Sequence, residues 1–117
     1  MTHILAAEQI WAERLLGREN TITAWPTVEV AAWDAWVERN AAAYADVIES
    51  LSVDQAVDYR TFTGEQFRST VGDLLLHVLS HGSYHRGQVA MLVAAAAGTP
   101  ASTDYVVFAN TVAKDDL

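Results

Sequence analysis

Helical spacing of apolar residues in three separate segments constrains the fold of this chain more than any other feature. The segments are 3–16, about 28–51, and 70 to about 97. In the first two, apolar side chains recur every three or four residues opposite a charged face, and the third is long and rich in apolar residues. Such helices bury their apolar faces against one another. The sequence therefore predicts an all-α helical bundle, formed as a single domain over residues 1–117.

Short breaks separate these helical segments. Gly17 and the run Gly98-Thr99-Pro100 are placed to end the first and third helices. Between the second and third helices, residues 57–67 alternate around Thr63-Gly64-Glu65, which predicts a short hairpin or a pair of extended arms. The tail holds an apolar cluster at 105–108 and an acidic end at 115–116. We therefore expect about three helices and one short extended segment.

The charge and composition exclude several classes of function. Seven basic and 15 acidic residues give a net charge of −8, which disfavours binding to nucleic acid or to an anionic membrane. The chain has no cysteine, so it has no disulfide, no thiolate nucleophile and no cysteine-based zinc site. We find no segment long and apolar enough to span a membrane and no secretory signal pattern. The cytoplasm is the expected compartment.

Three of the four histidines, His77, His81 and His85, stand four residues apart on the third predicted helix. Neighbours at this spacing share a helix face and can close on one metal ion, whereas the outer pair lies about 12 Å apart. An adjacent pair would therefore need a third ligand from another segment, and the remaining histidine is His3. A structural or solvated role is the alternative, because helices also produce such pairs by chance. The glutamate that a helical zinc protease needs beside its first histidine is absent.

Four tryptophans, at positions 11, 25, 33 and 36, are predicted to belong to the core and to helix contacts. Trp25 is the exception, since it lies in the predicted loop and could line a pocket.

Several runs of residues resemble the DinB-like superfamily, the damage-inducible proteins of that name, over nearly the whole chain. They are HVLSHGSYHRGQV at 77–89, GTP at 98–100 with STDY at 102–105, THILAAEQIW at 2–11, and the extended piece at 58–67 with its glycine. The resemblance implies a four-helix bundle with up-down-down-up order. It also implies a divalent metal, zinc, nickel or iron, held by His3, His81 and His85. His77 matches a family histidine that is not normally a ligand.

The resemblance also implies a helix before the one that carries His3, and this chain starts two residues ahead of that histidine. We therefore expect an N-terminally incomplete bundle. An apolar strip would then face water and would be covered by a second copy in a homodimer. The strip is predicted to contain Ile4, Ile10, Trp11, Leu15 and part of the 74–92 stripe.

Some proteins of this superfamily are thiol-dependent transferases or isomerases that use mycothiol, bacillithiol or glutathione. The resemblance thus implies a metal- and thiol-dependent enzyme with a small-molecule substrate. Arg86 is then a candidate for the carboxylate of the thiol cofactor, and no catalytic residue is assigned. The alternative is a non-catalytic stress-linked or interaction bundle with a vestigial metal site. A nucleic-acid role rests on the superfamily name alone, and the charge of −8 argues against it.

Overall fold

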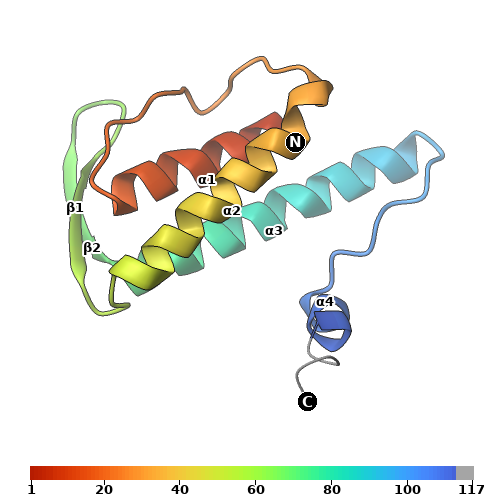
Figure 1. The fold of residues 1–117 in the computed structure, drawn as a ribbon. Coiled ribbons are helices and arrows are strands. Elements are labelled where there is room, and N and C mark those ends of the chain that lie inside the picture. Colours follow the sequence, from red (N-terminus) through yellow and green to blue (C-terminus); the bar gives the residue numbers. More distant parts are fainter. Residues whose placement is uncertain (113–117) are drawn as a thin grey trace. The chain divides into compact units, whose positions relative to one another are not determined.

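The computed structural model describes residues 1–112 as mostly helical, with one two-stranded sheet (Figure 1). Residues 113–117, including the acidic end, lie outside the described part. The elements in chain order are α1 (Thr2–Leu15), the 3-10 turn η1 (Val30–Ala32), α2 (Trp33–Ser50), β1 (Ala56–Arg60), β2 (Gln66–Thr70), α3 (Val71–Ala95) and α4 (Tyr105–Val112). The three predicted helices and the hairpin are confirmed. The expectation of only three helices was wrong, because the apolar cluster in the tail forms α4.

Two compact units make up the chain, residues 1–82 and residues 83–117, and their boundary falls inside α3. The first unit holds α1, α2, the hairpin and the first half of α3. The second holds the rest of α3 and α4. The prediction of a single domain stays a prediction.

The contacts of α1 show whether α2 and α3 run parallel or antiparallel to it. Going along α1, Leu5, Glu8 and Leu15 meet Asn40, Tyr44 and Val47 of α2 in the same order, so the two helices run parallel. This is achieved by the loop from residue 16 to 29, which returns along α1 before η1 begins (Figure 1). The contacts of α3 run in the opposite order, because His3 meets His81, Trp11 meets His77, and Leu15 packs with Leu74. Helix α3 is therefore antiparallel to α1.

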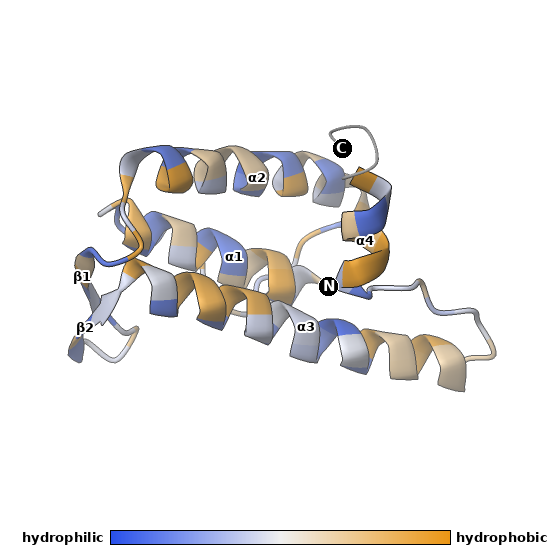
Figure 2. Ribbon diagram, turned by 90° about the horizontal axis from the view of Figure 1, so that it is seen from below, coloured by the Kyte–Doolittle hydropathy of each residue, from blue (hydrophilic) through white to orange (hydrophobic). Residues whose placement is uncertain are grey.

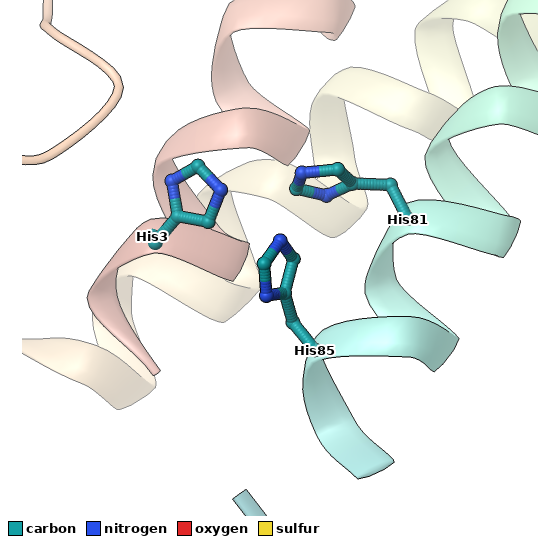
Figure 3. Close-up of side chains that lie close together, drawn as sticks. All are labelled: His3, His81 and His85. Carbon is teal, nitrogen blue, oxygen red and sulfur yellow. The ribbon is translucent and has the colours of Figure 1, made fainter. Parts of the chain in front are cut away.

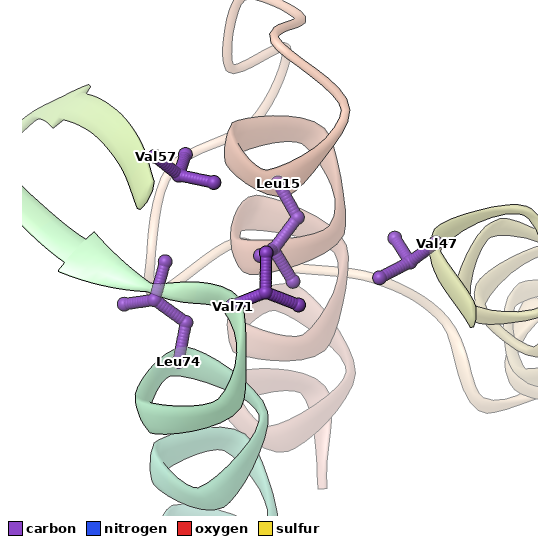
Figure 4. Close-up of a cluster of buried hydrophobic side chains, with 5 residues drawn as sticks. All are labelled: Leu15, Val47, Val57, Val71 and Leu74. Carbon is purple, nitrogen blue, oxygen red and sulfur yellow. The ribbon is translucent and has the colours of Figure 1, made fainter. Parts of the chain in front are cut away.

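The core forms where α1, α2, the hairpin and the start of α3 meet. Five buried side chains from these elements pack together there: Leu15, Val47, Val57, Val71 and Leu74 (Figure 4). A second cluster joins α1 to α2 through Leu5, Ala6 and Trp36. These contacts correct one expectation. Of the residues predicted to face water, Ile4, Ile10 and Leu15 are buried, each only 3% exposed, and Trp11 is half-buried. The part of the strip on α3 does face water, with Leu76, Leu79, Met91 and Leu92 between 62% and 74% exposed.

The hairpin leads directly into α3. Strands β1 and β2 pair antiparallel from Ala56 opposite Thr70 to Arg60 opposite Gln66. In the turn between them, Gly64 adopts a φ of 89°, which glycine tolerates better than other residues. At the other end, the Thr70 hydroxyl accepts a hydrogen bond from the Asp73 amide at 3.1 Å and donates one to the Asp73 carboxylate at 2.7 Å. The predicted Thr70–Asp73 pair thus caps α3.

Helices α1 and α3 end in the same way, with one residue in the left-handed conformation and two backbone amides bonded back to the last turn. Gly17 has a φ of 67°, and the amides of Gly17 and Arg18 bond back to the carbonyls of Arg14 and Glu13. At the end of α3 the left-handed residue is Ala97, with a φ of 59°, rather than the predicted glycine. A Cβ at position 98 would lie 2.9 Å from Cγ1 of Val93, so any residue other than glycine there would have to displace that side chain.

A half-buried tyrosine on α2, Tyr44, gives a prediction of how stability depends on alkaline pH. The hydroxyl of Tyr44 donates to the Glu8 carbonyl at 2.8 Å, and burial, followed by the charge of Glu8, raises the pKa of Tyr44 above its usual range. The folded state therefore keeps this proton while the unfolded state loses it near pH 10. We expect the wild-type free energy of unfolding to fall above about pH 10. Tyr44→Phe should cost about 1 kcal/mol at neutral pH but show less of this alkaline loss, as measured by urea unfolding between pH 8 and 11.

None of the described helices is both long enough and apolar enough to cross a bilayer.

Candidate metal centre

Three histidines from α1 and α3 converge. His3 lies in the first turn of α1, and His81 and His85 occupy successive turns of α3. One nitrogen from each ring lies within 4.8 Å of the others, and all three residues are half-buried. Figure 3 shows the three rings turned toward one another. The structure thus brings together the three residues that the resemblance implied.

His3 is held by the loop that returns along α1. Its Nδ1 lies 2.7 Å from the carbonyl oxygen of Ala24. Because a carbonyl only accepts, Nδ1 carries the proton, and Nε2 of the neutral ring keeps its lone pair for a metal. The indole of Trp25 stacks on the ring, with centroids 3.7 Å apart and planes 4° apart. Trp25 therefore fixes the orientation of His3 from its exposed loop position.

His85 is oriented in a similar way by its own helix. Its Nδ1 lies 2.7 Å from Oε1 of Gln88, and Nε2 of Gln88 donates to the hydroxyl of Tyr84 at 3.2 Å. With the amide oxygen accepting, Nδ1 of His85 is again the protonated nitrogen, and Nε2 is again the nitrogen that carries the lone pair in the neutral ring. Two of the three rings are thus held in the tautomer in which Nε2 is the nitrogen that can bind a metal.

The remaining residues predicted for the site lie outside this group. The ring of His77 packs edge-on against Trp11, with centroids 5.0 Å apart, and it does not join the ligand group among the described residues. Arg86 follows His85 on α3, and its guanidinium donates to Oγ of Ser83 at 3.2 Å. No described contact tests whether Arg86 binds a cofactor, so that role stays a prediction.

The donor set fits a divalent transition metal. Neutral imidazole nitrogens suit zinc, nickel and iron, and three protein ligands with one position left open are typical of catalytic zinc sites. Two nitrogens on one tetrahedral zinc ion, each bonded at about 2.0–2.1 Å, lie about 3.4 Å apart. Side-chain rotations of modest size bring the three nitrogens from within 4.8 Å to that separation. The three histidines could therefore hold a divalent metal ion.

Comparison with known proteins agrees with this geometry. The model of the DinB family matches residues 1–116. The chain belongs to the DinB family. One curated relative, Protein DinB of Bacillus subtilis (strain 168), is 42% identical over 41 residues, which is 35% of this chain and 24% of the relative. That match thus spans about a quarter of the relative's length. No solved structure matches the chain.

This DinB-family protein also has a cavity beside the histidines. The cavity measures about 280 Å³, and His3 and His81 line one part of it. Ala7, Ile10 and Arg14 of α1 continue the lining, together with Thr61 and Phe62 from the hairpin turn. A ligand that reached the histidines could therefore extend along α1.

Sequence reasoning missed the groups that orient the ligands. The carbonyl of Ala24 carries no signal in the sequence, because it reaches His3 only through the fold of the loop. Gln88 did carry a signal in the sequence, since it stands three residues after His85 and therefore on the same helix face. Sequence reasoning did not single out Arg14 as a site residue, yet it lines the cavity.

The Gln88 contact gives a prediction. Gln88→Ala should weaken zinc binding by about 10-fold or more, because His85 would lose the acceptor that fixes its tautomer. Competition with a chromogenic zinc chelator measures the affinity. Gln55→Ala, an exposed amide before β1, is the matched control and should bind zinc as tightly as the wild type.

Proposed function

We propose that His3, His81 and His85 hold one divalent metal ion, with zinc the first choice and nickel or iron as alternatives. The observation that carries the proposal is the convergence of three imidazole nitrogens within 4.8 Å. The hydrogen bonds that place the ring proton of His3 and of His85 on Nδ1, so that Nε2 is the unprotonated nitrogen, support it. Membership of the DinB family supports it as well.

The order of the helices supports a DinB-like bundle. Helices α1 and α2 run parallel and α3 runs antiparallel to them, which matches the last three helices of the up-down-down-up order. We therefore propose that the fold is this bundle. The cytoplasmic location stays a prediction.

For the activity, we propose a thiol-dependent transferase. When bound, the metal would lower the pKa of a thiol at its open position, so that sulfur reacts as the thiolate at neutral pH. The protein's own residues orient the metal ligands and provide space for the thiol cofactor. His3 and His85 keep their protonated Nδ1 atoms turned to Ala24 and Gln88, and the cavity along α1 gives the thiol cofactor a place beside them. The thiol proton is released to solvent, sulfur bonds to the electrophilic carbon, and the leaving group departs with its electron pair.

Turnover and binding together test this activity. Zinc-loaded protein is incubated with glutathione, bacillithiol or mycothiol and an aromatic chloride, and thioether formation is followed by absorbance. Calorimetry compares each thiol with its S-methyl derivative, which has no ionisable thiol. We expect zinc-dependent turnover with at least one thiol and weaker binding of its S-methyl form. Zinc binding without either effect would support the non-catalytic alternative, and no binding of zinc, nickel or iron would support a vestigial site.

We also propose that the chain forms a homodimer. Helix α2 and the first half of α3 leave an apolar groove of about 410 Å³, and large side chains on both walls are exposed, Ile48 by 72% and Leu79 by 65%. Figure 2 shows hydrophobic turns on both helices. The same chain carries a complementary surface, because α4 contains no charged residue and has no buried side chain. We assign the groove to α4 of a second copy, since eight helical residues, about 12 Å long, fit a groove that spans about 16 Å of α2.

Sedimentation velocity tests the dimer. We expect a dimer at micromolar concentration whose dissociation depends on protein concentration, and Phe108→Asp should shift it to monomer. Phe108 is 61% exposed in α4, so this change should not disturb the buried core. A concentration-independent, cooperatively folded wild-type monomer would contradict the proposal.

A further inference from the structure

The cavity beside the histidines contains a half-buried cation that forms no ion pair within the described residues. Arg14 is half-buried at the end of the cavity away from His3, and burial lowers the pKa of its guanidinium. Its Nε donates to the amide oxygen of Asn20 at 3.1 Å. Across residues 1–112, no carboxylate forms an ion pair with Arg14. The adjacent Glu13 is instead bound by Gln9, Asn20 and Thr21.

Three aromatic rings hold the guanidinium in place. Its central carbon lies 4.6 Å from the ring centre of Trp11, 5.3 Å from that of Phe62 and 5.6 Å from that of Tyr59. These rings shield part of the guanidinium from water and favour its positive charge, but they offer its two terminal nitrogens no charged acceptor. A guanidinium held in this way is organised to receive a planar anion through two parallel hydrogen bonds.

The position of Arg14 relates it to the metal-binding histidines. His3, Ala7, Ile10 and Arg14 are spaced by four, three and four residues, so they form one face of α1, and all four line the cavity. About 16 Å of helix rise separates the first from the last, and the Arg14 side chain points back along the helix toward Trp11. The guanidinium therefore lies near the level of Trp11, about 12 Å of helix rise from His3. A tripeptide-sized molecule, about 10 Å long when extended and in contact at about 3 Å with a group at each end, could reach both.

We propose that Arg14 binds the carboxylate of a small thiol or substrate whose other end reaches the histidines. The identity of the ligand rests on the proposed function, whereas carboxylate binding at Arg14 does not require the metal. The cavity thus recognises its ligand at two points, an anion site at Arg14 and the histidine cluster at His3 and His81. Between them, Ala7 and Ile10 contribute an apolar wall.

Glutathione and its diethyl ester test the inference, because they differ only in their two carboxylates. Calorimetry on metal-free and zinc-loaded protein should show glutathione binding at least 10-fold more tightly than the ester in both forms. Arg14→Gln should remove this preference while leaving zinc stoichiometry unchanged. Arg14→Lys, which keeps the charge but loses the planar fork, should restore part of it. Arg39→Gln, on α2 and outside the cavity, should keep the full preference.

Further variants distinguish carboxylate binding by Arg14 from a purely structural role of Arg14 and from carboxylate binding by Arg86. Phe62→Ala removes one exposed ring of the cage and should weaken glutathione binding without loss of fold. If Arg14→Gln unfolds the chain, loss of the preference in Phe62→Ala still supports the inference, and full retention there overturns it. A preference that survives Arg14→Gln but disappears in Arg86→Gln would overturn it in favour of Arg86. Equal binding of glutathione and its ester by the wild type would also overturn it.

Discussion

Replacing His81 by alanine is expected to abolish stoichiometric zinc binding, with a loss of affinity of about 100-fold or more. His81 stands between the other two ligands, four residues before His85 on α3 and with its ring centroid 5.0 Å from that of His3. Its removal leaves one ligand from each helix, and two imidazoles do not complete a zinc site. His85→Ala and His3→Ala should have comparable effects, which titration against a zinc chelator measures.

His77→Ala is the matched control for these variants. It changes the same residue type on the same helix, one turn before His81, but its ring packs on Trp11 rather than in the ligand group. Most of the zinc affinity should therefore remain. An equal loss in His77→Ala, His81→Ala and His85→Ala would show that zinc binds along α3 without the predicted selection of ligands.

The second large effect concerns stability. Leu74→Ala should lower the free energy of unfolding by about 2–5 kcal/mol, because Leu74 is only 4% exposed and packs with Leu15, Val47, Val57 and Val71. Urea unfolding followed by circular dichroism measures the change. Leu76→Ala is the control on the same helix, and its side chain is 62% exposed. It should cost less than about 1 kcal/mol, and equal losses in the two variants would contradict the assignment of the core.

The helices of this fold were predictable because their spacing is encoded locally. Apolar periodicity gave α1, α2 and α3, and the Thr70–Asp73 pair marked the start of α3 to within one residue. Helix α4 was missed because four apolar residues in a row show no helical period. The burial of Leu15 could not be predicted, because it depends on contacts with side chains of α2, the hairpin and α3 that lie far away in the sequence.

The metal-binding residues were predictable only in part, because spacing along one helix is local whereas contacts between distant segments are not. Spacing alone indicated that two of His77, His81 and His85 could share a metal, but it left the choice of pair open. His3 was implied by the resemblance to the DinB family, since nothing local to residue 3 connects it to residue 81. The carbonyl of Ala24 and the cage around Arg14 arise from contacts between distant segments, and such contacts leave no pattern in a single sequence.

Diffraction from crystals of the zinc-loaded protein, recorded on both sides of the zinc absorption edge, would locate the bound metal directly. We expect one anomalous peak per chain, at about 2.0–2.1 Å from a ring nitrogen of each of His3, His81 and His85. A peak bound by His77, a peak on surface carboxylates alone, or the absence of any peak in crystals grown with stoichiometric zinc would contradict the proposed metal site.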